Sequence, residues 1–172
     1  MADIERNVEI ERRFLVSDPS ILKGASREII VQGYFFAKNG YAARIRRLHH
    51  VEEDGTVYES RATLTLKGPR YGASRVEYEM GIDPKFAESM LKEIEHKITK
   101  SRYQIIVEGE TWDVDVFHGD NEGLIIAECE MEEARNLRTP IWSSQEVTDR
   151  REYDNENLAM RPFKTWPKGV GG

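Results

Sequence analysis

The segment VEIERRF, residues 8–14, alternates apolar and charged side chains. Successive side chains of a β-strand point to opposite faces, so this period of two predicts a strand over about residues 8–16. One face carries Glu9, Glu11 and Arg13, while the apolar side chains share the other face. The apolar face suits packing, whereas three charges on one face need water, a ligand or ion-pairing partners.

The same alternation recurs along most of the chain. It predicts seven further strands at about residues 28–37, 42–52, 56–67, 74–82, 98–107, 111–118 and 124–132. Short turn-like stretches such as Asp54-Gly55 and Glu108-Gly109 favour antiparallel hairpins between them. One helix is predicted at about residues 84–97, because Asp83 is a good N-cap and Pro84 fits the first turn. The fold class expected is therefore α+β, dominated by strands.

Length and composition indicate one domain. The chain has 172 residues, of which 39% are hydrophobic, and this is enough to fold around a core of its own. We treat residues 1–172 as a single domain with a barrel core at about 8–132 and a C-terminal helical segment at about 133–165. Within that segment, Ser143–Val147 and Asn155–Arg161 are expected to form short helical pieces.

Charge and cysteine content exclude several classes of protein. The net charge of −6 argues against nucleic-acid binding through a generally basic surface. Cys129 is the only cysteine, so an intramolecular disulfide and a thiolate zinc cluster are excluded. No apolar run approaches the ~18 residues needed to span a bilayer. We expect a cytoplasmic protein that binds neither nucleic acid nor a membrane.

The polar faces of the predicted strands carry an ordered set of charges. The acids are Glu9, Glu11, Glu77, Glu79, Asp113, Asp115, Glu128 and Glu130, and the bases are Arg13, Arg44, Arg46, Lys67, Arg75, Lys100 and Arg102. A charged strand face is usually just solvated, but repetition on one parity of successive strands favours an enclosed interior. We expect an eight-stranded antiparallel β-barrel with an ionic, wet lumen and an apolar outer wall. The predicted helix and the C-terminal segment are available to cover that wall.

The two signs of charge suit two kinds of ligand. Guanidinium groups bind phosphate in a bidentate manner, so the bases suit an elongated polyanion. The carboxylates of Glu9, Glu11, Asp115, Glu128 and Glu130 are hard oxygen ligands of the type that Mg²⁺ or Mn²⁺ prefers. The residues alone therefore indicate a metal-dependent phosphoanhydride site.

Several motifs carry a resemblance to a known family. The segment at residues 8–14 resembles the opening ExExK strand of the CYTH superfamily, the triphosphate tunnel metalloenzymes. The motifs that follow in the family's order are Gln32-Gly33-Tyr34, Arg44-Ile45-Arg46, Thr63–Gly68, Arg75–Glu79, Lys100–Tyr103, Trp112–Asp115 and Glu128–Glu130. The resemblance covers roughly residues 8–132. It implies an eight-stranded tunnel, bound Mg²⁺ or Mn²⁺, and a small-molecule substrate that contains a triphosphate.

The resemblance also implies roles for individual residues. Its metal-binding carboxylates correspond to Glu9, Glu11, Glu128 and Glu130, with Asp115 as an additional candidate. Its phosphate-binding bases correspond to Arg44, Arg46, Lys67, Arg75, Lys100 and Arg102. Glu77 and Glu79 either orient these bases or bind metal. Candidate catalytic residues are Arg13, Glu128 and Tyr34, although a plain packing role is equally open for Tyr34.

Arg13 departs from the family motif, which ends in a lysine that positions or activates the attacking water. Arginine keeps its proton at neutral pH, so it binds phosphate or orients a neighbour but is a poor general base. Either metal and a carboxylate activate the water, or the activity is altered.

The reaction expected is hydrolysis of inorganic triphosphate to pyrophosphate and phosphate, because the chain has little extra sequence from which to build a nucleoside pocket. A class IV adenylyl cyclase, a thiamine triphosphatase and a non-catalytic polyphosphate-binding module are the alternatives. A homodimer stays open as well, since a second subunit is another way to cover the apolar outer wall.

Overall fold

The protein is built around nine strands and two short helices. The computed structural model describes residues 4–58, 60–131 and 138–167, with side chains from Ile10 onward. The strands are β1 (Ile4–Val16), β2 (Arg27–Lys38), β3 (Tyr41–Val51), β4 (Arg61–Tyr71), β5 (Ser74–Gly81), β6 (His96–Val107), β7 (Glu110–Phe117), β8 (Ile125–Met131) and β9 (Ser143–Glu146). The helices are α1 (Pro84–Glu93) and α2 (Asn155–Met160), and 3₁₀ turns lie at Pro19–Leu22, Gly119–Asn121, Arg151–Tyr153 and Phe163–Thr165.

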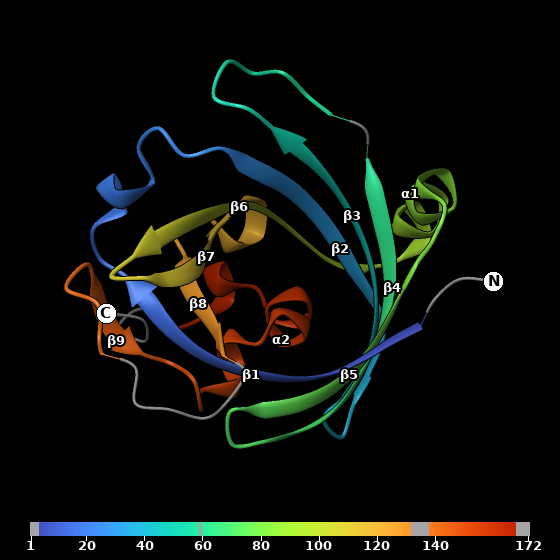
Figure 1. Ribbon diagram of the computed structural model, residues 1–172. Coiled ribbons are helices and arrows are strands. Elements are labelled where there is room, and N and C mark those ends of the chain that lie inside the picture. Colours follow the sequence, from blue (N-terminus) through green and yellow to red (C-terminus); the bar gives the residue numbers. More distant parts are fainter. Residues whose placement is uncertain (1–3, 59, 132–137, 168–172) are drawn as a thin grey trace.

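Eight of the strands close into an antiparallel barrel (Figure 1). Their order is β5-β4-β3-β2-β6-β7-β8-β1, and β1 closes the ring by also pairing with β5. The first half of β1, Ile4–Ile10, pairs with β5, and its second half, Ile10–Leu15, pairs with β8. The predicted eight-stranded antiparallel barrel is confirmed. Closure places one face of each strand in a common interior.

The tight turn predicted at Glu108-Gly109 joins β6 to β7. Glu108 has φ 51° and Gly109 has φ 82°, the pair of positive angles that a two-residue hairpin of type I′ requires. The expected end of the fourth strand was wrong, because β4 does not stop at Lys67 but continues to Tyr71. A bulge between Lys67 and Arg70 takes up one extra residue in β4, so the strand bends instead of turning.

Helix α1 covers part of the outer wall, as predicted. Asp83 accepts hydrogen bonds from the backbone N–H groups of the first turn, at 2.9 and 3.0 Å, which fixes the start of the helix. Leu91 and Ile94 are buried against the outer faces of β3 and β4. A Cβ at Gly33 would lie 2.9 Å from Ile94 Cγ2, so glycine permits this close approach. The helix ends at Glu93, earlier than expected, because Ile94 has an extended backbone that leads into β6.

A second part of the outer wall is covered by aromatic packing. Trp142, which precedes β9, meets Trp112 of β7 edge to face at 5.1 Å between ring centroids, and Trp112 meets Phe14 at 5.8 Å. Cys129 is buried in the same cluster. Both tryptophans are thus packing residues, and Cys129 behaves as a small buried hydrophobe.

The prediction of a helical piece at Ser143–Val147 was wrong. Residues Ser143–Glu146 form β9, which pairs with Phe14–Val16 of β1. Arg12 holds this strand through Glu146, with Nη2 2.6 Å from Oε2. The short segment has no alternation of its own, so its conformation is decided by pairing with Phe14–Val16 of β1, which lie beyond the residues paired with β5.

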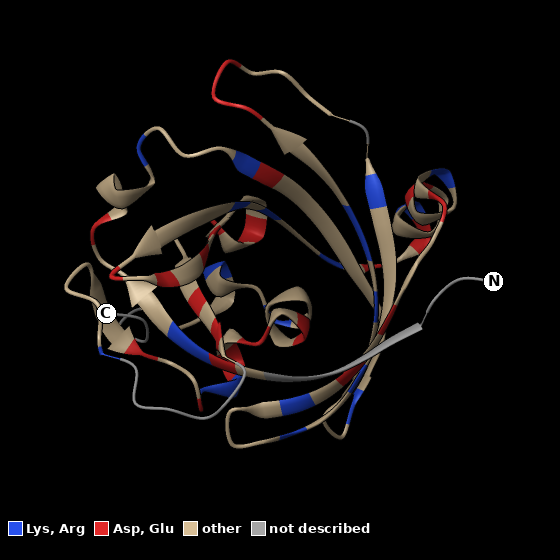
Figure 2. Ribbon diagram, viewed as in Figure 1, with Lys and Arg blue, Asp and Glu red and all other residues tan. Residues whose placement is uncertain are grey.

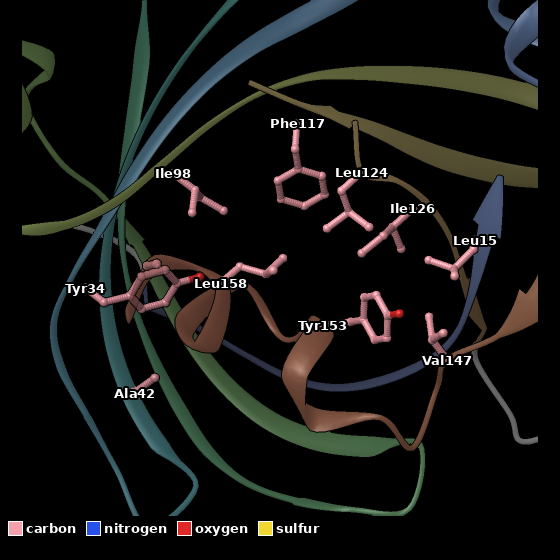
Figure 3. Packing of buried hydrophobic residues seen from close by; sticks show 11 residues of the cluster. Leu15, Tyr34, Ala42, Ile98, Phe117, Leu124, Ile126, Val147, Tyr153 and Leu158 are labelled. Carbon is pink, nitrogen blue, oxygen red and sulfur yellow. The ribbon is translucent and has the colours of Figure 1, made fainter. Parts of the chain in front are cut away.

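Helix α2 confirms the second C-terminal helical prediction, but its position corrects the expected role. It lies within the ring of strands instead of covering the outer wall (Figure 1). Leu158 of α2 and the nearby Tyr153 are buried among inward-facing side chains that include Phe117 and Ile126 (Figure 3). Inward positions near one end of the barrel are apolar, so the C-terminal segment buries more apolar surface inside than it could outside. The lumen is therefore ionic in its middle and filled by an apolar plug at this end.

Neither α1 nor α2, which are the α-helices of the described residues, is long and apolar enough to cross a membrane.

Candidate active site

A polar cavity of about 210 Å³ lies inside the barrel, on the side of α2 that is not packed into the apolar plug. Acidic and basic segments of β1, β5 and β8 gather around it (Figure 2). Its described lining is Glu11, Arg13, Tyr34, Arg44, Arg46, Lys67, Arg70, Arg75, Glu77, Glu79, Arg102, Glu128, Glu130, Asp154, Asn155 and Glu156. Most of the residues selected from sequence parity thus meet in one enclosed volume.

Arg44 and Arg46 project side by side from β3. Arg44 Nη2 donates to Glu79 Oε2 at 3.1 Å and to Thr65 Oγ1 at 2.8 Å. Arg46 Nε donates to Gln32 Oε1 at 3.1 Å. Burial, together with the positive charges of Arg44 and Arg102, lowers the pKa of Arg46 to about 10. The Arg46 guanidinium therefore remains charged at neutral pH, close to the positive charge of Arg44.

Glutamates of β5 hold bases of the neighbouring strands in place. Lys67 Nζ pairs with Glu77, which lies directly opposite it across β4 and β5. Glu79 accepts from Thr65 Oγ1 at 2.6 Å in addition to Arg44. Burial raises the pKa of Glu79, but the Thr65 hydrogen bond and the charge of Arg44 outweigh it, so the net shift is downward. In these contacts Glu77 and Glu79 orient basic side chains, which is one of the two roles predicted for them; the other is metal binding.

Lys100, Arg102 and Asp115 form an ion-pair network at the wall of the cavity. Lys100 and Asp115 are almost fully buried beneath the lining, whereas Arg102 lines it. Asp115 accepts from Lys100 and, at 2.8 Å on each oxygen, from Arg102. Arg102 also donates to Asp113 at 2.8 Å and to Glu128 at 2.9 Å. Asp115 therefore faces two bases, which engage both of its carboxylate oxygens.

The pKa values of this network follow from its burial and its charges. Burial lowers the pKa of Lys100 to about 8, against the opposing effect of Asp115. Burial also raises the pKa of Asp115, but Arg102 and Lys100 outweigh it and hold that pKa well below its ordinary range. Asp115 is thus ionised throughout the neutral range and fixes the guanidinium of Arg102 toward the cavity.

Arg75 lines the cavity with its whole guanidinium group engaged. Its Nε donates to Gly68 O at 2.7 Å and its Nη2 donates to Gly40 O at 3.0 Å. Its Nη1 lies 2.7 Å from Glu156 Oε1. These contacts link β5 to the β2–β3 hairpin, to the bulge of β4 and to α2. Arg75 therefore braces the end of the cavity next to α2 besides carrying a positive charge there.

Arg13 is turned toward the C-terminal segment. Its Nη1 donates to Tyr153 O at 3.2 Å, and its Nη2 donates to Thr148 O at 3.2 Å and lies 2.7 Å from Asp154 Oδ1. The side chain is 1% exposed. Where the family motif has lysine, this chain therefore has an arginine that anchors the segment closing the barrel.

Tyr34 lies between the charged cavity and the apolar plug. Its side chain packs in the plug, and its hydroxyl accepts a hydrogen bond from Gln32 Nε2 at 2.7 Å. Burial raises the pKa of Tyr34 well above its ordinary value, so the phenol stays protonated. The structure thus gives Tyr34 both a packing contact and a polar group at the cavity.

The metal-binding prediction concerns Glu9, Glu11, Glu128 and Glu130. The side chain of Glu9 lies outside the described residues, although its backbone pairs with β5. Glu11 and Glu130 lie directly opposite each other on β1 and β8, and with Glu128 they line one end of the cavity. Two like charges in opposite positions disfavour each other, and hard carboxylate oxygens suit a divalent cation between them. Among the described side chains, however, no three acids, histidines or cysteines converge closely enough to form a metal site.

Four lining residues were missed by sequence reasoning. Arg70 Nη2 donates to Glu11 Oε1 at 2.8 Å, although its even number places it on the outer parity of the fourth strand. The bulge in β4 inverts that parity, and the pair Gly68-Pro69 was the available signal, since proline within a strand marks an edge or a bulge. The other three missed residues belong to the C-terminal segment and are Asp154, Asn155 and Glu156. The sequence of this segment does not alternate, so it gives no indication of which side chains face inward.

Comparisons with known proteins agree with this geometry. A scan against protein-family models finds no match. An inorganic triphosphatase of Acetivibrio thermocellus is 37% identical over 161 residues, which cover 92% of this chain and 97% of that protein. An inorganic triphosphatase of Nitrosomonas europaea is 31% identical over 159 residues, covering 88% and 97% respectively. The crystal structure of the inorganic triphosphatase NE1496 superposes with a TM-score of 0.62 and 29% identity, covering 88% of this chain and 94% of that one.

Proposed function

Because the chain belongs to the CYTH-type family of inorganic triphosphatases, we propose that it hydrolyses inorganic triphosphate to pyrophosphate and phosphate inside the barrel. The observation that supports this most is the enclosed cavity in which six arginines and a lysine lie with carboxylates of β1 and β8. A cavity lined by both bases and carboxylates suits a phosphate chain that binds together with a divalent cation.

The lining favours a bare phosphate chain over a nucleotide. Tyr34 is the one aromatic residue among the described side chains that line the cavity, and its hydroxyl is engaged by Gln32. A base would need a stacking platform or an apolar pocket, and the remaining lining is polar or charged. Inorganic triphosphate can pair its phosphate oxygens with the basic side chains, and it needs neither a stacking platform nor an apolar pocket.

The bases act by positioning the phosphate chain. Arg44 and Arg46 form one side of the cavity, and Arg102 projects from the network around Asp115. Their carboxylate and amide partners fix the orientation of each guanidinium before substrate binds, so less conformational entropy is lost on binding. Negative charge that develops on the phosphate oxygens is stabilised by groups already in place.

A divalent cation, Mg²⁺ or Mn²⁺, belongs to the proposal. Glu11, Glu128 and Glu130 would hold it, with Glu9 as a further candidate from the sequence. When bound, such an ion neutralises part of the charge on the phosphate oxygens. Glu128 lies at the cavity surface, where Arg102 donates to one of its oxygens at 2.9 Å, and its carboxylate would also orient the attacking water. Arg13 is bound to backbone carbonyls of the C-terminal segment, and a guanidinium is a poor general base, so the proposal gives it no role in activating the water.

The test is a substrate panel with tripolyphosphate, pyrophosphate, ATP and thiamine triphosphate, each with Mg²⁺ or Mn²⁺ and with a chelator. We expect phosphate release from tripolyphosphate well in excess of that from ATP, and its loss on chelation. Cyclic AMP from ATP would replace the proposal with a cyclase. Metal-sensitive binding without phosphate release beyond a metal-only blank would replace it with a binding module.

A further inference from the structure

A second cavity, of about 430 Å³, lies behind the inner end of the active-site cavity. The hairpin between β2 and β3, the bulged end of β4 and the C-terminal segment enclose it. Its charged lining residues are Lys38, Arg70, Arg75, Arg151, Asp154 and Glu156, so cations are in excess. Arg70, Arg75, Asp154 and Glu156 also line the active-site cavity. These four side chains therefore form the wall between the two cavities.

Ion pairs hold the carboxylates of this wall in position. Glu156 lies 2.7 Å from Arg75, whose remaining nitrogens bind the carbonyls of Gly68 and Gly40. Asp154 lies 2.7 Å from Arg13. Because the arginines are themselves fixed by backbone carbonyls, a bound phosphate cannot pull them away from the wall without breaking several contacts.

Two of the four side chains of the wall, Asp154 and Glu156, are acidic, and both line the active-site cavity. Glu156 is buried, and burial raises its pKa, but Arg75 and Lys67 outweigh this effect and the net shift is downward. Glu156 is thus ionised at neutral pH. A further phosphate at the inner end would need the space of this carboxylate and would meet its charge at close range in a poorly screened environment.

We propose that Glu156, held by Arg75, determines specificity by limiting the tunnel to a chain of three phosphates and excluding longer linear polyphosphates. The inference rests on the proposed triphosphatase function. Lys38 and Arg151 on the far side of the wall would receive an additional phosphate once the wall no longer repels it.

The test compares tripolyphosphate with tetrapolyphosphate under identical metal conditions by initial rates of phosphate release. For the wild-type protein, we expect kcat/KM for tetrapolyphosphate to be at least about tenfold lower. Glu156→Gln keeps the shape of the side chain and removes its charge, and it is expected to raise the tetrapolyphosphate-to-tripolyphosphate ratio about fivefold or more, mainly by lowering KM for the longer chain. The matched control is Glu152→Gln, because Glu152 lies in the same segment, pairs with Arg150 at 2.7 Å and lines neither cavity.

The outcomes separate the inference from the function on which it rests. Equal efficiency on the two substrates in the wild type, a result that needs no variant to fold, overturns the inference. A ratio that moves equally in both variants, or in neither, overturns it as well. Absence of phosphate release from tripolyphosphate refutes the proposed function instead.

Discussion

Arg70 Nη2 lies 2.8 Å from Glu11 Oε1, across the interior of the barrel, although the numbering of β4 assigns Arg70 to the outer face. The bulge at Gly68-Pro69 inserts one residue and turns the side chains that follow it to the opposite face. This places one more guanidinium group beside Glu11, one of the candidate metal-binding carboxylates.

We expect Arg70→Ala to raise KM for tripolyphosphate about tenfold, because one charge-assisted contact is worth about 1.5 kcal/mol. The value of kcat should change less. Initial rates over a range of substrate concentrations test this. Lys92→Ala on the exposed face of α1 is the control, and an unchanged KM in both variants would show that Arg70 does not contact substrate.

Arg13→Lys tests the anchor of the C-terminal segment. Lysine keeps the charge but cannot reproduce the fork that binds Thr148 O, Tyr153 O and Asp154. We expect the free energy of unfolding to fall by about 1–3 kcal/mol in urea titrations. The control is Arg12→Lys, since Arg12 points to the other face and its pair with Glu146 is partly exposed, so a loss below about 1 kcal/mol is expected there. Equal losses would argue against the anchor.

Glu130→Ala and Arg47→Ala compare the two faces of the barrel wall. Glu130 lines the cavity, whereas Arg47 lies on the opposite parity of β3 and donates to Ser60 at 3.1 Å. We expect Glu130→Ala to lower kcat/KM about a hundredfold or more by weakening the metal, with partial recovery at high metal concentration. Arg47→Ala should stay within about twofold. Similar losses in both would defeat the assignment of the interior as the active site.

Acid should weaken the contact between α2 and β5. The folded-state pKa of Glu156 is shifted down from its ordinary value of 4.5, so its contribution to stability is complete above about pH 4.5 and is lost as the pH falls through the folded-state pKa. Urea unfolding at several pH values between about 3 and 7 measures this. The stability difference between the wild type and Glu156→Gln should shrink on acidification. A difference that stays constant or grows would contradict the ion pair with Arg75.

The sequence allowed the face of most charged residues to be predicted, because alternation is a local property of a strand. Odd or even position in a strand was enough to predict an inward side chain for four residues that line the cavity: Glu11, Arg44, Lys67 and Arg102. Parity failed at Arg70, where one extra residue inverts the faces. It could not place Glu156 either, because a helix of six residues has no inward side until it packs against something.

The eight barrel strands, their antiparallel order and the gathering of acids and bases were thus determined by the sequence itself, through side-chain alternation and short turns. Only the tertiary structure decided that the C-terminal segment enters the barrel, that Ser143–Glu146 becomes a strand, and that Arg13 and Arg75 hold that segment. The physical reason is that burial and ion pairing depend on partners distant in sequence. Burial of Leu158 stabilises the fold only because Phe117 and Ile126 line an apolar end of the interior.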